Sequence, residues 1–193
     1  MDNELFMFYR NSLSRNLCRE YSDMFKKNLG DKKRMISLAM QQQSIPYVAT
    51  SIYEGWGVDI GYLKNNYKGY INGQYSPKDC DMVQGYSYEL WCDYKASMKV
   101  KTDIVHMVQC ECDVNIRQTK CPTIYVSNKS NINLKSQGYN TIIVYLFDDS
   151  IINIDNTDSN TNIIVYKYSD NAKVVIGDKN KGKIKKFDKT LRL

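Results

Sequence analysis

The sequence predicts an α+β fold in which an N-terminal helical domain, residues 1–78, precedes a short β-solenoid of about five coils, residues 79–193. Two observations predict this fold. The first half carries apolar residues at the three- and four-residue spacing of amphipathic helices, and the second half carries a degenerate repeat of strand, polar turn and strand. With 193 residues, 42% of them hydrophobic, the chain can bury a core.

The repeat is clearest in the segments 124–134, 144–154 and 165–176, where alternating β-branched residues flank a corner of Asn, Asp or Ser. One coil cannot bury its inner face until the next coil stacks on it, so repeats of this length are typical of a solenoid. The same alternation upstream gives five pairs of inward-facing residues: Met98/Val100, Val114/Ile116, Ile132/Leu134, Ile152/Ile154 and Val174/Ile176. Their first members are 16, 18, 20 and 22 residues apart.

Three helices are predicted in the first half. One spans 13–29, a second is capped by Asp31 and ends before Pro46, and a third, shorter helix is capped by Asp59. Asp at these positions can accept a hydrogen bond from an unpaired amide of the first helical turn.

The junction between the two halves is marked by turn-forming residues at 75–79. Alternating aromatic and small residues over 86–95 then predict the first strand pair of the solenoid.

The first strand of each coil is apolar on both faces. If Val144 and Leu146 face the core, Tyr145 must face away from it, and strands that are apolar on both sides are buried on both sides. The outer face is therefore predicted to be covered, either by the N-terminal helices or by a partner chain. The predicted partner-binding residues are Tyr125, Ile143, Tyr145, Phe147, Ile164, Tyr166 and Tyr168.

The formal net charge of +6 resides almost entirely at the C-terminal end. Seven basic residues there, less Asp178 and Asp188, give a net +5. These residues are Lys179, Lys181, Lys183, Lys185, Lys186, Lys189 and Arg192. They are interpreted as a charged cap that stops end-to-end stacking of the last coil, with anion or nucleic-acid contact as the alternative.

Six cysteines without a secretory signal pattern predict reduced thiols and no disulfide. His106, Cys110, Cys112 and Cys121 are ligand types that zinc prefers, but stacking of the coils is expected to place Cys112 near Ser130, so no metal and no cofactor is predicted. No segment is apolar enough to span a bilayer, and the chain is expected to be made in a cytoplasm.

Catalytic patterns are weak, and the prediction is that the chain is not an enzyme. His106 is the sole histidine, and no nucleophile motif accompanies it. Stacked acids beside the tyrosine row could bind or cleave a polysaccharide, yet corner positions favour Asp for turn formation alone. These acids are Asp148, Asp149, Asp155, Asp158 and Asp170.

Five segments, 41–47, 70–73, 120–125, 166–170 and 189–193, resemble small uncharacterised proteins encoded in tailed-phage and prophage genomes of gut anaerobic bacteria. The resemblance covers nearly the full length and brings no catalytic residues. It implies a phage product that is made in the bacterial host cytoplasm and incorporated into the virion.

The function predicted from these observations is that of a non-enzymatic phage structural or interaction protein, such as a virion or tail-fibre attachment component. Its expected partners are other phage structural proteins or a second copy of itself. The alternatives are a nucleic-acid-binding or host-defence-blocking protein that uses the basic C-terminal residues, and a polysaccharide-binding or polysaccharide-cleaving solenoid.

Overall fold

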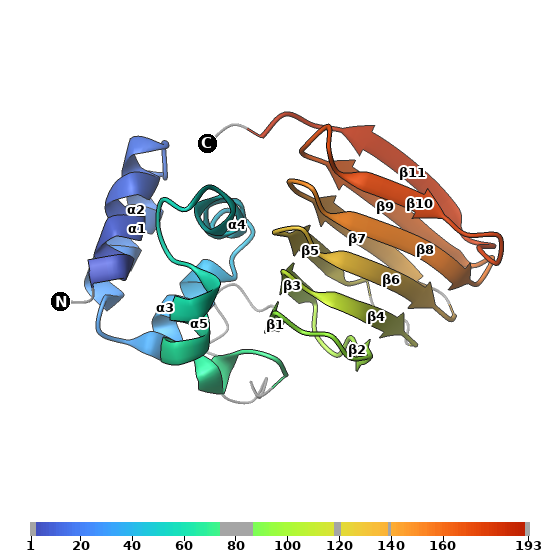
Figure 1. Cartoon of the computed structure of the whole chain (residues 1–193), viewed down its shortest axis with the longest axis horizontal. Helices are drawn as coiled ribbons and strands as arrows, with labels where there is room; N and C mark the ends of the chain where they lie inside the picture. Colours follow the sequence, from blue (N-terminus) through green and yellow to red (C-terminus); the bar gives the residue numbers. More distant parts are fainter. Residues whose placement is uncertain (1–2, 74–86, 118–120, 139, 192–193) are drawn as a thin grey trace.

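A computed structural model describes residues 3–73, 87–117, 121–138 and 140–191. The described residues form five α-helices followed by a β-solenoid of about five turns, which confirms the predicted α+β fold (Figure 1). The helices are α1 Asn3–Ser14, α2 Arg19–Asn28, α3 Lys32–Ala39, α4 Ile45–Glu54 and α5 Ile60–Asn66, with a short 3-10 turn at Lys68–Tyr70.

The strands alternate between two parallel sheets. The six-stranded sheet has the order β1-β3-β5-β7-β9-β11, namely Tyr88–Cys92, Ile104–Val108, Thr123–Ser127, Asn140–Leu146, Thr161–Lys167 and Lys183–Asp188. The five-stranded sheet has the order β2-β4-β6-β8-β10, namely Met98–Lys99, Glu111–Ile116, Asn131–Ser136, Ile151–Thr157 and Lys173–Ile176.

Two of the predicted helix starts are confirmed by their caps. The Asp31 carboxylate accepts a hydrogen bond from the Arg34 amide at 3.1 Å, at the start of α3. The Asp59 carboxylate accepts one from the Tyr62 amide at 2.6 Å, at the start of α5. Both satisfy amides that the helix itself leaves unpaired.

The single helix predicted over 13–29 is wrong. Helix α1 ends at Ser14, and Asn16 adopts the left-handed region at φ 65°, which no continuous helix tolerates. Pro46 lies beyond the end of α3, as predicted, but it also lies in the first turn of α4, a helix that the prediction did not include. A proline fits there because the first turn does not use its missing amide.

The stacking register of the solenoid is confirmed at three of the four predicted steps. Met98 pairs with Val114, Ile132 with Ile152, and Ile152 with Val174. The step between the second and third coils is wrong, because Ile132 pairs with Cys112 and not with Val114. A shift of two residues leaves every side chain on the same face, so the hydrophobic pattern alone does not detect it.

One interior corner of the solenoid is a column of small residues. The Cys110 amide donates to Ser130 Oγ at 2.9 Å, and the Ser130 amide donates to Ser150 Oγ at 3.2 Å. Cys110, rather than Cys112, is therefore the cysteine beside Ser130, which corrects the predicted placement. These side chains are buried, and the two serine hydroxyls accept hydrogen bonds from backbone amides of the preceding coil.

The strand pair predicted over 86–95 is also wrong. Its described part contains one strand, β1, which pairs in parallel with β3. The predicted domain boundary at 75–79 lies outside the described residues.

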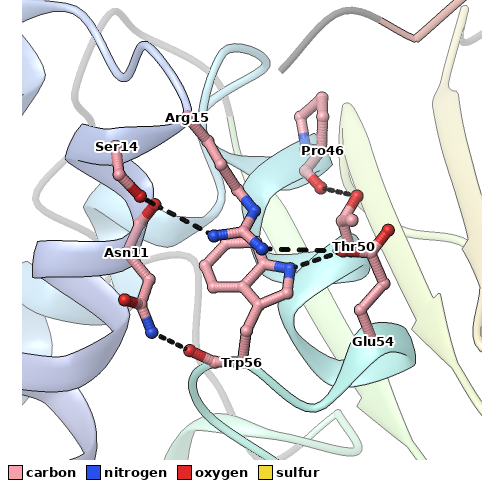
Figure 2. Close-up of polar contacts among 7 residues, drawn as sticks. All are labelled: Asn11, Ser14, Arg15, Pro46, Thr50, Glu54 and Trp56. Carbon is pink, nitrogen blue, oxygen red and sulfur yellow. Dashed lines mark hydrogen bonds and ion pairs between the residues drawn. The ribbon is translucent and has the colours of Figure 1, made fainter.

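Helix α1 is attached to the end of α4 by a cluster around Trp56 (Figure 2). The Arg15 guanidinium lies 4.3 Å from the centre of the Trp56 ring, and Arg15 Nη2 lies 3.9 Å from a Glu54 carboxylate oxygen. The same carboxylate accepts a hydrogen bond from Trp56 Nε1 at 3.0 Å, while the Asn11 side chain donates to the Trp56 carbonyl at 2.5 Å. These contacts set the position of α4, the helix that lies against β5.

Two apolar clusters result from this arrangement. One fills the solenoid interior with Ile132, Ile152 and Val165, among others. The other lies between the helices and the outer face of the six-stranded sheet, and it joins helical residues such as Phe8 to sheet residues such as Tyr125. The helical part thus packs on the solenoid through a shared apolar core.

Candidate protein-interaction surface

An aromatic ladder runs along the outer face of the six-stranded sheet. We use this name for the column Tyr125, Tyr145, Tyr166 and Phe187 with its neighbours Phe147 and Tyr168. Parallel register places the column residues opposite one another on β5, β7, β9 and β11. Their ring centres are 4.8, 5.3 and 5.4 Å apart along the column, close to the spacing of neighbouring strands.

The rings of the ladder lie nearly parallel to one another. The interplanar angles along the column are 12°, 21° and 24°. Each inner ring therefore has both faces against a neighbouring ring, and only its edge is free to meet another molecule. The column ends at Phe187 in the last strand. One face of this ring stacks on Tyr166, and no further described ring stacks on the other face.

The helices cover the first part of the outer face. Strands β1, β3 and β5 are buried at every position, and Tyr125 and Phe147 are each only 3% exposed. Two hydrogen bonds attach α4 to the solenoid corners: Asn128 Nδ2 donates to the Ala49 carbonyl at 3.1 Å, and the Tyr53 hydroxyl donates to Asp149 at 2.9 Å. The predicted cover is thus provided by the helices over this part.

Burial decreases along the rest of the face. The outward residues of β7 and β9, namely Ile143, Tyr145, Ile164, Tyr166 and the following Tyr168, are half-buried, and Phe187 on β11 is 44% exposed. Burial raises the pKa of the Tyr145 and Tyr168 hydroxyls, so both are neutral near pH 7. Phe187 was not among the predicted partner-binding residues, although an alignment of β11 with β9 places it opposite Tyr166.

A groove of about 170 Å³ separates α4 from the uncovered part of the ladder. Its walls include Tyr53 on one side, Phe147 and Tyr168 on the other, and Leu191 near the end of the chain. Helix α4, the groove and the adjoining part of the ladder therefore form one continuous surface.

The basic C-terminal residues belong to the last coil of the solenoid. Lys183, Lys185 and Lys186 are on β11, and Lys189 Nζ lies 5.6 Å from the centre of the Tyr166 ring. Lys179, Lys181 and the four lysines just named are all exposed, whereas Arg192 lies outside the described residues. Positive charge therefore borders the open end of the aromatic ladder.

The candidate zinc ligands are not brought together. His106 is on the outer face under the helices and shares a 2.9 Å hydrogen bond with Ser127 Oγ, whereas Cys110 and Cys112 are in the solenoid interior. Burial lowers the His106 pKa to about 3 and raises the pKa of Cys110 to about 11. Among residues 3–73, 87–117, 121–138 and 140–191, no group of three or more His, Cys, Asp or Glu side chains is placed to hold a metal.

Four of the five acids predicted for polysaccharide chemistry are hydrogen-bonded within the protein. Asp148 accepts hydrogen bonds from the amides of Asn128 and Lys129, Asp149 accepts one from Tyr53, Asp155 one from the amide of Lys179, and Asp158 one from the amide of Gly138. Asp170 is exposed. Asp148, Asp155 and Asp158 thus bind backbone amides of a neighbouring coil, whereas Asp149 binds α4.

Comparisons with protein-family models, with curated proteins and with solved structures found no match for this chain. None of the described helices has both the length and the apolar character that crossing a bilayer requires.

Proposed function

We propose that this chain is a non-enzymatic interaction protein that binds a protein partner through its helices and the uncovered part of the aromatic ladder. The observation that carries the proposal is the gradient of burial across one sheet. The same outer face is fully covered over β1, β3 and β5 and only half-covered over β7 and β9, although its residues remain aromatic and β-branched. A contiguous apolar face of this kind favours a protein interface.

The resemblance to phage-encoded proteins supports a more specific proposal, that the partner is another structural protein of a tailed-phage particle or a second copy of the chain. In this proposal the chain is made in the host cytoplasm and is incorporated into the virion, at the tail or its fibre attachment point. The solenoid supplies a rigid face because its two sheets share one packed interior.

Ring geometry favours a protein partner over a carbohydrate. Sugar rings stack on the face of an aromatic side chain, and in the inner part of the ladder those faces are in contact with neighbouring rings. A protein partner can pack against the ring edges and against the flanking Ile143 and Ile164. Such packing does not require a free ring face.

The experiment compares how much wild-type protein and how much Ile164→Glu variant is incorporated into phage particles. Mass spectrometry of purified virions measures both amounts. Ile164 is half-buried and pairs with Lys185 of the next coil, so the variant is expected to fold. The proposal expects wild-type protein in the particle, loss of Ile164→Glu from it, and normal incorporation of Asn160→Glu, a control in an exposed turn. Absence of the wild-type protein from virions contradicts the phage proposal, and normal incorporation of Ile164→Glu contradicts the interface.

A second candidate function, nucleic-acid binding, is favoured by one observation, the six exposed lysines of the last coil and its flanking turns. The two functions differ in their dependence on salt. Binding to phosphate weakens steeply as salt rises, whereas association through the ladder should hold or tighten. Electrophoretic mobility shift of an oligonucleotide at low and high salt distinguishes them.

A further inference from the structure

The last coil of the solenoid ends on a free strand edge. Strand β11 pairs with β9 on one side, and no other strand in the described ranges pairs with its far side, where it forms the end of the stack (Figure 1). Alternate backbone amides and carbonyls of such an edge strand point outward and can pair with another chain.

The opposite end of the same sheet shows how this fold covers an edge. Ile71 forms a parallel bridge with Leu90 of β1, and the Asn72 amide donates to the Leu90 carbonyl at 2.9 Å. The Asn72 side chain continues the pairing: its oxygen accepts from the Cys92 amide at 2.8 Å, and its nitrogen donates to the Cys92 carbonyl at 3.1 Å. One bridging residue and the side chain of the residue after it therefore suffice to pair with this edge.

Apolar groups are also exposed at the free end. Val175 and Ile176 on β10 are 48% and 46% exposed, and Phe187 on β11 is 44% exposed. Phe187 stacks on Tyr166 with one face, so an aromatic ring on an added strand would extend the ladder by one step. Within the chain, each such step brings the ring centres to about 5 Å.

The charges at this end define the partner. Lys183, Lys185 and Lys186 are exposed along β11, and Lys186 stands at an inward-facing position, opposite the buried Val165. Elsewhere on the solenoid surface, two lysines pair with acids on a neighbouring coil. Lys135 Nζ lies 2.6 Å from a carboxylate oxygen of Asp113, and Lys167 Nζ lies 3.4 Å from one of Asp188.

We infer that the β11 edge binds an extended acidic segment of a partner protein, which adds as a further strand and places an aromatic side chain against Phe187. Glutamates or aspartates of that segment face Lys183, Lys185 and Lys186. A purely apolar strand would bury the Lys186 ammonium without a partner, and a second copy paired edge to edge would bring lysines against lysines. The inference rests on the proposed function in requiring a protein partner, but its surface is the β11 edge, which shares only Phe187 with the ladder.

The test measures binding of a fluorescent peptide to the full chain by anisotropy. The probe is a synthetic peptide of about ten residues with the central sequence Glu-Val-Glu-Glu-Tyr, which in parallel register stands opposite residues 183–187. Two control peptides replace each glutamate with lysine or alternate residues with proline, which cannot donate to a strand ladder. The acidic peptide alone should bind.

The matched variants are Lys183→Glu with Lys185→Glu on β11, and Lys26→Glu with Lys27→Glu on α2, where both lysines are also exposed. The β11 pair should weaken peptide binding about tenfold or more, since two attractions become repulsions, and the α2 pair should leave it unchanged. Circular dichroism on heating checks that each variant is folded. Phe187→Ala should also weaken binding.

Several results would overturn the inference. If the proline peptide binds as tightly as the acidic peptide, charge attracts the peptide without strand pairing. If the acidic peptide does not bind, the lysines only protect the edge from pairing. If an oligonucleotide displaces the acidic peptide and the proline peptide binds equally well, the lysines bind nucleic acid. If the chain forms a dimer in the absence of peptide, and Lys183→Glu abolishes that dimer, the edge binds a second copy. Ile143→Glu separates this inference from the proposed function, because Ile143 is on β7, which does not pair with β11, so the variant should block particle incorporation and leave peptide binding unchanged.

Discussion

The side-chain amide of Asn128, at a solenoid corner, donates a 3.1 Å hydrogen bond to the carbonyl of Ala49 in α4, across 79 positions of sequence. Asn128 has φ 60°, in the left-handed region that Asn tolerates better than most residues. One residue thus both forms the corner and holds the helix that covers the outer sheet face.

Replacement of Asn128 separates these two roles. Asn128→Ala should lower the free energy of unfolding by about 1–3 kcal/mol, because it removes the hydrogen bond and strains the backbone. Asn128→Gly should cost less, since glycine adopts positive φ freely. Urea unfolding of both variants measures the difference, and equal stabilities would show that the backbone contributes nothing.

Ile152 tests the solenoid interior. It is fully buried and stacks between Ile132 and Val174, so Ile152→Ala should leave a cavity and cost about 2–5 kcal/mol. Its neighbour Asn153 faces outward and bonds the side chains of Asn131 and Asn133, and Asn153→Ala should cost much less. Similar losses in thermal or urea unfolding would contradict the register.

His106 predicts a pH dependence of stability. Burial holds its folded-state pKa at about 3, below the ordinary value of 6.5, so between these values the unfolded chain binds a proton that the folded chain does not. This contribution to stability is complete above pH 6.5 and is lost as pH falls toward 3, at about 1.4 kcal/mol per pH unit.

The measurement compares wild type with His106→Leu by urea unfolding at pH 7 and pH 5, above the range in which most carboxylates titrate. Because the chain has a single histidine, the extra loss in wild type reports His106 alone. Parallel pH profiles for the two proteins would mean that the imidazole is not held neutral by burial.

Gly182 tests the close approach that forms the last coil. A Cβ there would lie 2.9 Å from the Thr161 carbonyl oxygen and 2.9 Å from Thr157 Oγ1, so Gly182→Ala should displace the start of β11 and cost about 1–3 kcal/mol. Gly69→Ala is the control, because nothing lies within 4 Å of its Cβ position. Hydrogen exchange at β11 amides should accelerate in Gly182→Ala only.

The solenoid could be predicted because its signal is local and repeated. Residues such as Ile132 and Ile152 alternate with asparagines, and this period of two defines the buried face of each strand. The register at Cys112 could not be predicted, since a slip of two residues preserves that alternation. Helix α4 was missed because its start depends on how Pro46 is used, as a terminator or as a first-turn residue.

The sequence could predict which face of the sheet carries the aromatic ladder, because Tyr145 must face away from the core if Val144 faces inward. That the face is covered could also be predicted, but how far the helices extend over it could not. The division between buried Tyr125 and half-buried Tyr166 depends on contacts such as Asn128 to Ala49, which join segments far apart in the sequence.

Hydroxyl-radical footprinting of Ile164 and Tyr166, in the free protein and in the purified particle, tests the central claim most directly. If the uncovered ladder is a protein interface, both side chains react in the free protein and become protected in the particle, while the buried Tyr125 stays unreactive in both. Equal reactivity of Ile164 and Tyr166 in the two samples, or absence of the protein from the particle, would contradict the account.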